Sequence, residues 1–398
     1  MRSTLGRMHR PISRGVGSNM LLTNNIGDGS TLTLDFMSGV LDSRLSFARA
    51  STGTFIGSDG YVQTASAGTP RFQYGSAGLP LGLLIEGSAT NLLTYSEAFT
   101  PDWTDTNITR TSSTATSPAN TATALLATAS AGNATIIRSA AVGTTAIRTY
   151  SIWLRRVTGT GNIQLTQNGG GSWTTTTITS SWARYSLSPI NANHQVGIRI
   201  VTSGDEIEMW GAQLETGSGI TSYIPTAGST VTRSSDHCTM AASSFITGSP
   251  YPQTLLIDCI PQSASVGFPD LIRLFDRSGP TFSYGNEIYY FGASTMSLQR
   301  KITATSNTDT TMSSGLAYNT RYRIATSISS TAFLGSRNGV TGSGATGAPA
   351  ALSSSVTHLG IGCNGDSSPV SVMFGTIRQI KFWPVAFDQT TLNGLTTL

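Results

Sequence analysis

Charged side chains are scarce in this sequence. Only 11% of the 398 residues are Asp, Glu, Lys or Arg, and lysine occurs just twice, at Lys301 and Lys381. Extended helical architecture is therefore excluded, because long helices and coiled coils draw about half of their residues from Ala, Glu, Lys, Leu and Arg. The sequence also lacks the run of roughly 18 apolar residues that a membrane helix needs, and no apolar segment of the secretory type follows its basic N-terminus. We expect no membrane partner.

Cysteine is nearly absent, and small polar residues take the place of charge. The three cysteines, Cys238, Cys259 and Cys363, are too few for a disulfide framework, which indicates folding in a reducing cytoplasm. Serine and threonine make up about 28% of the chain, and there are 43 glycines. Apolar residues occur throughout the sequence and the net charge is only +4, so disorder is not expected.

The excess positive charge lies at the N-terminus. Arg2, Arg7, Arg10 and Arg14 all precede the first acidic residue, Asp28, and the other 20 basic residues balance 20 acidic ones. Because duplex nucleic acid is held by a basic surface, we expect no nucleic-acid partner for the folded body. We interpret residues 1–19 as an anchoring arm that binds a partner protein; a solvated terminus is the alternative.

Alternating apolar residues predict short β-strands along the whole chain. Leu32, Leu34 and Phe36 alternate with polar residues, and so do Tyr150, Ile152 and Leu154 and, later, Ile207 and Met209. Strands that follow each other at intervals of about 8 to 12 residues, with Gly, Asn and Ser between them, indicate antiparallel sandwiches. The fold class expected from the sequence is all-β, with two antiparallel β-sandwiches.

Punctuation by Gly and Pro over 216–235 divides the two strand series. We therefore predict an arm at 1–19, a β-rich segment at 20–99, a first sandwich at 100–232 and a second at 233–398. Asn338 and Gly339 predict a hairpin. Asp388 is expected to cap a short terminal helix that carries Leu392 and Leu395.

No constellation of catalytic residues stands out, and we expect a protein that is not an enzyme. Glycoside hydrolysis needs two carboxylates at a defined separation. The one acidic cluster is Asp205, Glu206 and Glu208. On a strand, Glu206 and Glu208 share a face beside Trp210, where they would either meet a sugar or form a solvated strand face.

Aromatic side chains are the other candidates for glycan binding, because an indole face stacks on the C–H face of a sugar. Trp173 follows the glycines at 169–171 in a predicted loop, where it either binds a ligand or packs under its own loop. Trp153, Trp182 and Trp210 lie in strand patterns and are expected in the core or on a sheet face. No cofactor is expected, except that Asn364 and Asp366 would either ligate Ca²⁺ or form a turn.

Three stretches resemble bacteriophage proteins. The segment from LDFMSGVLDSRLSFARASTG to GLLIEGSATNLLTYSEAF resembles the N-terminal part of phage tail-fibre and minor structural proteins. MWGAQLETGSGITSYIPTAGSTVTRSSD resembles the end of a galactose-binding-like jelly roll, a fold of carbohydrate-binding modules. HLGIGCNGDSSPVSVMFGTIRQIKFW is similar to a concanavalin A-like, or laminin-G-like, lectin sandwich.

This resemblance implies a structural protein of the phage virion, assembled in the host cytoplasm. Its expected role is that of a tail fibre or receptor-facing appendage whose arm binds other tail, baseplate or capsid proteins and whose sandwiches bind host-surface glycans. Family analogy implies a homo-oligomer, with a trimer as the expectation for a fibre. The alternative is a head-decoration or head-fibre protein that uses the sandwiches for protein contacts. A capsule depolymerase is a third hypothesis, which the small number of acidic residues disfavours.

Overall fold

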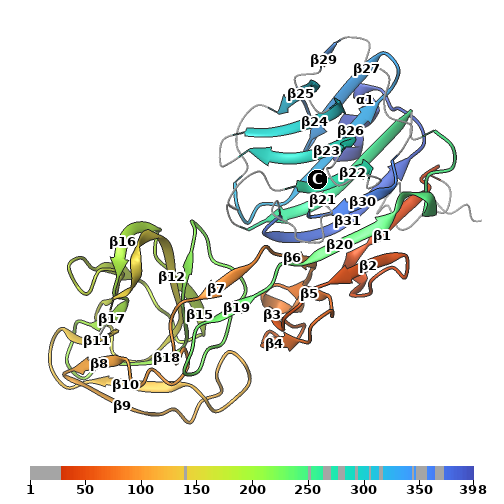
Figure 1. Ribbon diagram of the computed structural model, residues 1–398. Coiled ribbons are helices and arrows are strands. Elements are labelled where there is room, and N and C mark those ends of the chain that lie inside the picture. Colours follow the sequence, from red (N-terminus) through yellow and green to blue (C-terminus); the bar gives the residue numbers. More distant parts are fainter. Residues whose placement is uncertain are drawn as a thin grey trace, which may run out of the picture.

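The structure is a computed structural model. It describes residues 28–138, 141–249, 252–262, 270–276, 283–291, 295–303, 306–312, 317–342, 345–346, 356–363 and 372–398. Antiparallel sheets dominate these residues, and their single α-helix, α1 (Gln389–Thr396), is short. The predicted all-β class is confirmed. Figure 1 shows two lobes, of which the larger holds both ends of the described chain.

Two sheets form the larger lobe. The first has the order β28-β27-β26-β21-β31-β6-β5, with β1 paired to β31 and β29 paired to β27. Its strands are β1 (Leu32–Asp35), β5 (Arg71–Tyr74), β6 (Pro80–Ile85), β21 (Gln253–Pro261), β26 (Tyr322–Ile328), β27 (Ala332–Arg337), β28 (Val340–Thr341), β29 (Ala345–Thr346) and β31 (Gly375–Trp383). The second sheet has the order β2-β20-β30-β22-β23-β24-β25. Its strands are β2 (Leu45–Ala48), β20 (His237–Ala241), β22 (Asp270–Asp276), β23 (Ser283–Phe291), β24 (Thr295–Thr303), β25 (Ser306–Met312) and β30 (His358–Ile361).

The smaller lobe is a second sandwich. One sheet has the order β15-β12-β18-β10-β9 with β16 on β12, and the other has the order β14-β13-β17-β11-β8. The first contains β9 (Ile108–Ser112), β10 (Leu125–Ala129), β12 (Val142–Thr158), β15 (Ala183–Ser186), β16 (Ile190–His194) and β18 (Glu206–Thr216). The second contains β8 (Trp103–Thr106), β11 (Ala134–Arg138), β13 (Ile163–Thr166), β14 (Thr174–Thr176) and β17 (Gly197–Ile200).

Short elements link the lobes or close turns. β7 (Ala89–Asn91) and β19 (Val231–Arg233) pair with each other and run side by side between the lobes in Figure 1. β3 (Gly53–Ile56) and β4 (Val62–Ala65) form a hairpin of their own. The 3-10 turns are η1 (Phe36–Ser38), η2 (Ser76–Gly78) and η3 (Ala242–Ser244).

The N-terminal segment belongs to the larger sandwich. β1 and β6 pair with β31, while β2 pairs with β20, so residues 32–85 supply strands to both sheets. Leu34 and Leu83 share one core with Met240 and Ile257. The predicted division set residues 20–99 apart as a segment in front of two successive sandwiches. The structure differs, because the chain leaves the larger sandwich after β7 and returns to it through β19.

Local patterns were reliable. Leu32 and Leu34 are buried in β1, and Tyr150, Ile152 and Leu154 of β12 lie in the core of the smaller lobe. Asn338 and Gly339 join β27 to β28 with φ values of 47° and 81°. Two positive φ angles are typical of the tight hairpin turn that the Asn-Gly pair predicts. Asp388 caps α1 by accepting a hydrogen bond from the Thr391 amide at 2.8 Å.

Candidate functional site

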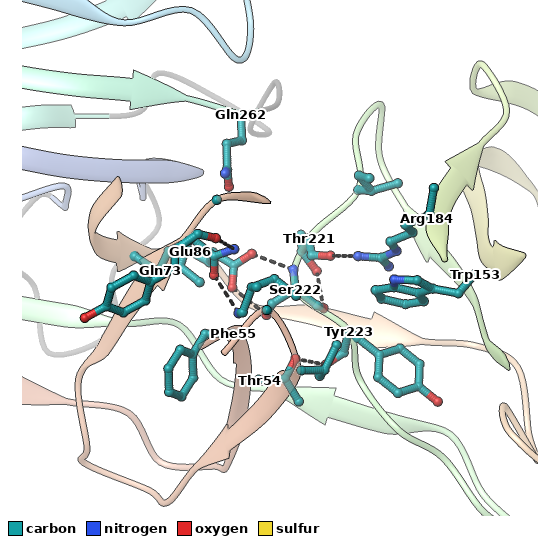
Figure 2. A pocket seen from close by; sticks show the side chains of 18 of the residues that line it. Thr54, Phe55, Gln73, Glu86, Trp153, Arg184, Thr221, Ser222, Tyr223 and Gln262 are labelled. Carbon is teal, nitrogen blue, oxygen red and sulfur yellow. Dashed lines mark hydrogen bonds between the residues drawn. The ribbon is translucent and has the colours of Figure 1, made fainter. Parts of the chain in front are cut away.

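A cavity of about 410 Å³ lies where the two lobes meet. The β3–β4 hairpin contributes Phe55 and β5 contributes Gln73, while Trp182 comes from the smaller lobe just before β15. Gln262 and Asn319 enter from the end of β21 and the loop before β26. Figure 2 shows Gln262 pointing from the larger lobe toward Gln73, with Trp153 and Arg184 on the opposite wall. The cavity is therefore composite, because no single segment supplies its walls.

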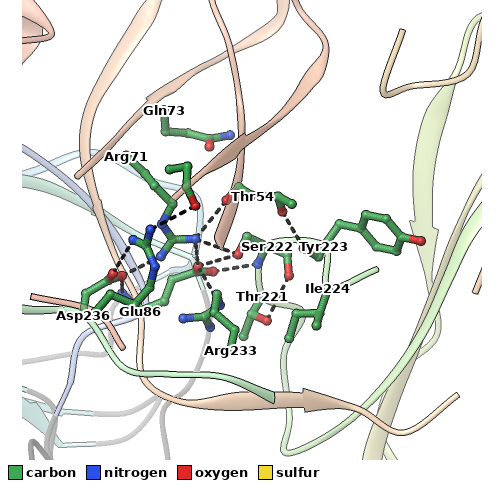
Figure 3. Close-up of polar contacts among 12 residues, drawn as sticks. Thr54, Arg71, Gln73, Glu86, Thr221, Ser222, Tyr223, Ile224, Arg233 and Asp236 are labelled. Carbon is green, nitrogen blue, oxygen red and sulfur yellow. Dashed lines mark hydrogen bonds and ion pairs between the residues drawn. The ribbon is translucent and has the colours of Figure 1, made fainter. Parts of the chain in front are cut away.

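A buried ion network forms one side of this cavity (Figure 3). Glu86 Oε2 accepts hydrogen bonds from Arg71 Nη1 and from the Ser222 hydroxyl, both at 2.7 Å. The Ser222 amide donates to Glu86 Oε1 at 2.7 Å, and Arg233 Nε lies 3.5 Å from Oε2. Ser222 belongs to the chain segment that returns from the smaller lobe, so the carboxylate of Glu86 ties the two lobes together.

The electrostatics of the network keep Glu86 ionised. Burial raises the pKa of this carboxyl, but Arg233 and Arg71 together with the Ser222 hydrogen bonds overcome that effect and hold it at about 2. Among the described residues that line the cavity, Glu86 is the only acid. Because both of its oxygens already accept hydrogen bonds, it is poorly placed to act as a general acid or base.

Arg184 stiffens the wall formed by the smaller lobe. Its Nη1 donates to the Thr221 carbonyl at 2.6 Å, and its Nη2 donates to the Ser151 hydroxyl at 2.9 Å. The guanidinium carbon lies 4.5 Å from the ring centroid of Trp153, within the range of a cation–π contact. Burial lowers the pKa of Arg184, while Glu215 and Glu86 act to raise it. The side chain is thus held in place by three interactions beside the cavity.

Trp210 lies behind this wall and is buried. Its ring contacts Trp153 and Tyr223 at centroid distances of 5.3 and 4.6 Å, and only 1% of the residue is exposed. Val62 of the β3–β4 hairpin packs against the same cluster, which is where the lobes dock. The indole Nε1 donates to Thr123 Oγ1 at 2.9 Å. Trp210 was predicted as a glycan-binding residue, but its burial leaves no ring face for a sugar.

Glu206 and Glu208 share the outer face of β18 with Trp210, as their spacing predicts, because Ile207 and Met209 point into the core. Neither glutamate lines the cavity. Glu206 accepts hydrogen bonds from the hydroxyls of Thr128 at 2.9 Å and Thr158 at 2.6 Å.

Glu208 has a charged partner, whereas the partners of Glu206 are hydroxyl groups. It pairs with Arg155 and accepts a hydrogen bond from the Ser113 hydroxyl, and 5% of the residue is exposed. Its carboxylate is therefore satisfied inside the smaller lobe. Of the three residues predicted to form one sugar site, Glu208 and Trp210 are buried and Glu206 is partly exposed.

Trp173 follows the predicted glycine-rich turn but does not line the cavity. The guanidinium carbon of Arg199 lies 4.5 Å from its ring centroid, and a Cβ on Gly170 would come within 3.1 Å of its Cζ2. Trp173 is half-buried in this arrangement. The ring thus packs on its own loop and on β17, with part of its surface open to solvent.

The remaining predicted sites lie outside the described residues. These are the arm residues Arg2, Arg7, Arg10 and Arg14 and the Ca²⁺ candidates Asn364 and Asp366. In the described part of the chain, no three His, Cys, Asp or Glu side chains gather as metal ligands would. No helix there combines the length and the apolar character needed to cross a membrane.

Comparison with known proteins finds distant structural neighbours. No family model matches the chain, and no curated protein matches it. Among solved structures, it is similar to the CBM40 of the Ruminococcus gnavus IT-sialidase bound to α2,3 sialyllactose, at 10% identity over 37% of this chain and 82% of the module, with a TM-score of 0.32. Domain 4 of the Geobacillus stearothermophilus arabinanase AbnA, in complex with arabinotriose, matches at 13% identity over 46% of this chain and 84% of that domain, with a TM-score of 0.34.

A third neighbour is the SAP-like pentraxin of Limulus polyphemus. It matches at 12% identity over 35% of this chain and 67% of the pentraxin, with a TM-score of 0.29. Carbohydrate-binding modules and a pentraxin are thus among the structural neighbours. Identities of 10 to 13% and TM-scores of 0.29 to 0.34 make this a distant likeness.

Sequence reasoning missed this cavity. Gln73, Gln262 and Asn319 are ordinary strand-end and loop residues, and Trp182 was expected in the core or on a sheet face. The local signal was the presence of Trp153 on β12 and of Trp182 just before β15, the strand that pairs with β12. Only the pairing of strands far apart in the sequence brings these side chains together.

Proposed function

We propose that the chain is a non-enzymatic glycan-binding protein and that the cavity between the lobes is its binding site. The observation that carries this proposal is the combination of aromatic and uncharged polar side chains around one cavity of about 410 Å³. Binding sites for small ligands commonly enclose roughly 300 to 1,000 Å³. The cavity therefore has room for a ligand of the size of a short oligosaccharide.

The chemistry of the walls suits a sugar. Phe55 and Trp182 offer aromatic surface for the C–H faces of a sugar ring. Within the described part of the chain, the side-chain amides of Gln262 and Asn319 make no hydrogen bond, so both donors and acceptors are available to sugar hydroxyls. Glu86 is saturated by Arg71 and Ser222, so we infer binding without hydrolysis.

We further propose that the protein is a structural component of a bacteriophage virion, most simply a tail fibre or receptor-facing appendage. The resemblance of its N-terminal and inter-lobe segments to phage proteins supports this role. In this proposal the basic arm at 1–19 binds other virion proteins, the chain forms a homo-oligomer such as a trimer, and no resident cofactor is required. Ca²⁺ at Asn364 and Asp366 remains a sequence-based alternative to a simple turn.

The glycan proposal is tested by binding the full chain to a bacterial glycan array and to host cells. Two tryptophan variants separate the candidate sites, since each ring is half-buried and lies near an arginine: Arg155 is 5.5 Å from Trp182, and Arg199 is 4.5 Å from Trp173. We expect Trp182→Ala to weaken binding at least about tenfold, because it removes the stacking contact between the indole and a sugar ring. Trp173→Ala should leave binding nearly unchanged. Loss in Trp173→Ala alone would move the site to that loop, and a wild-type chain that binds no glycan would refute the proposal.

The virion role is tested by location. A gold-labelled antibody against residues 233–398, applied to intact particles and viewed by electron microscopy, is expected to mark the tail end. Label over the head would instead support the decoration or head-fibre alternative, in which the sandwiches make protein contacts.

A further inference from the structure

Three arginines surround one carboxylate on the outer face of the first sheet of the larger lobe. The Arg321 guanidinium makes a bidentate contact with the Asp258 carboxylate: Nε donates to Oδ1 at 3.0 Å, and Nη2 donates to Oδ2 at 2.6 Å. Arg323 Nε and Arg378 Nε lie 3.7 and 3.6 Å from the same carboxylate. Asp258 is almost completely buried under them, whereas 42%, 20% and 19% of the side chains of Arg321, Arg323 and Arg378 are exposed. We call these three residues the arginine cluster.

The arginine cluster has more positive charge than Asp258 can neutralise. Its Arg321 fork occupies both carboxylate oxygens, and the buried Nε atoms of Arg323 and Arg378 have no hydrogen-bond partner. Burial lowers the pKa of both side chains, and the nearby positive charge of Arg321 lowers it further. Asp35 of β1 adds a more distant attraction for Arg378. An additional anion at this surface would relieve the crowding of like charges.

Strand register connects the arginine cluster to the cavity. Asp258 lies on β21 and pairs with Arg323 of β26 on one side. On its other side β21 pairs with β31, which has a bulge at this point, and Arg378 is the bulged residue. On the next strand, β6, Gly82 lies beside Arg378, and Gly82 pairs with Gln73 of β5, which lines the cavity. One row of residues therefore crosses the sheet from the arginine cluster to the cavity: Arg323, Asp258, Arg378, Gly82 and Gln73.

The burial of the flanking residues places this row on the outer face. Ile257 and Cys259 flank Asp258 and point into the core, so the Asp258 side chain points to the outer face; Leu83, beside Gly82, also points into the core. Adjacent strands are separated by about 4.8 Å, which puts Gln73 roughly 10 Å from the strand of Arg378.

Gly82 lies between the two sites and has no side chain. A Cβ at this position would lie 2.1 Å from the Ile377 carbonyl oxygen and 3.0 Å from Arg378 Cα, and its φ of 113° also excludes other residues. Gly82 itself therefore places no side chain between Arg378 and Gln73. Arg378 also reaches β6 directly, since its Nη1 donates to the Pro80 carbonyl at 3.4 Å. Pro80 in turn pairs with Tyr74, another residue of the cavity wall.

We propose that the ligand of the cavity is an anionic saccharide, whose carboxylate, sulfate or phosphate group binds the arginine cluster while a neighbouring sugar unit occupies the cavity. This inference rests on the proposed glycan-binding function and specifies its ligand class. Guanidinium groups bind such oxyanions through paired, charge-assisted hydrogen bonds. An acidic protein segment would satisfy the arginines equally well but would leave the adjoining aromatic and amide groups of Phe55, Trp182 and Gln262 without a role.

The test compares charged and neutral glycans on the full chain. A bacterial polysaccharide array with acidic and neutral members is probed with wild type, Arg378→Gln, Arg321→Gln and the control Arg44→Gln. The Arg44 side chain pairs with Asp42 at 2.7 Å on the surface and is 37% exposed, which is close to the 42% of Arg321 but places the change elsewhere. Either cluster variant leaves two guanidiniums beside Asp258, so folding should be preserved, and thermal melts check this.

We expect wild type to bind acidic members, with the affinity falling at least about tenfold in Arg378→Gln and Arg321→Gln and staying constant in Arg44→Gln. The carboxyl-reduced or desulfated form of the best acidic ligand should bind as weakly to wild type as the acidic form binds to the variants. Higher salt should weaken binding of the acidic form alone.

Other outcomes overturn the inference. If wild type binds neutral members only, or if the cluster variants bind acidic members as tightly as wild type, the arginine cluster has no role in the ligand and the proposed function stands alone. If wild type binds no glycan, both proposals fail together. Binding of a poly-glutamate peptide in place of every acidic glycan would assign the cluster to an acidic protein partner instead.

Discussion

Arg71 Nη2 lies 2.5 Å from Asp236 Oδ2, and neither side chain is exposed. The two residues are 165 positions apart, because the whole smaller lobe is inserted between them. Asp236 also accepts a hydrogen bond from Arg49 at 3.1 Å, and Arg71 reaches on to Glu86. The part of the larger sandwich that precedes the smaller lobe and the segment through which the chain returns are therefore locked to each other by buried charge.

Removal of the Asp236 carboxylate should be strongly destabilising. In Asp236→Asn the guanidinium of Arg49 loses its ionic partner, and Arg71 keeps Glu86 as its one carboxylate partner. Leaving buried charge uncompensated costs about 3 to 5 kcal/mol of the free energy of unfolding. Urea unfolding followed by tryptophan fluorescence measures the loss. The matched control is Asp42→Asn, whose partner Arg44 is exposed and whose loss should cost less than about 1 kcal/mol. Equal losses in the two variants would contradict a structural role for the buried network.

The pH dependence of stability should carry a signature of Glu86. Its pKa of about 2 in the folded chain is below the ordinary value of 4.5, so its contribution is complete above about pH 4.5 and is lost as the pH falls toward 2. A shift of this size corresponds to roughly 3 kcal/mol.

Unfolding titrations of wild type and Glu86→Gln between pH 2 and 6 measure this contribution. The variant should be less stable near pH 6, and the difference between the two proteins should shrink as the pH falls. Parallel profiles for the two proteins would show that Glu86 does not titrate with unfolding.

The aromatic cluster at the lobe contact should contribute mainly to stability. Trp210→Ala removes a fully buried indole that contacts Trp153 and Tyr223, and truncations of this kind cost about 3 to 5 kcal/mol. Trp173→Ala, at a half-buried ring, should cost less than half as much. Thermal unfolding compares the two variants, and a Trp210 variant as stable as the Trp173 variant would exclude the proposed docking role of this cluster.

The three thiols should be inert in the native protein. Cys238, Cys259 and Cys363 are all buried and form no disulfide, and burial raises the pKa of the Cys238 and Cys259 thiols. Since the thiolate is the reactive form, Ellman's reagent should label none of them quickly at pH 8 and all three after denaturation. Rapid labelling of any thiol without denaturant would show that the core of the larger lobe, which holds all three cysteines, opens readily.

Local sequence determined the individual elements. Alternation fixed which residues of β1, β12 and β18 face a core, Asn338 and Gly339 fixed a hairpin turn, and Asp388 fixed the start of α1. These features depend on side chains within a few positions of one another, so periodicity and turn chemistry reveal them. The all-β class followed from the same patterns.

Tertiary structure alone decided how these elements combine. Strand patterns do not say which strands pair, and pairing β1 and β6 with β31 merged two segments that looked separate in the sequence. Docking of the β3–β4 hairpin on the smaller lobe buried Trp210, and the contact between the lobes gathered Trp182, Gln73 and Gln262 around one cavity. Burial of a tryptophan, or its exposure to a ligand, depends on what packs against its outer face, and here that is a hairpin more than a hundred residues away in the chain.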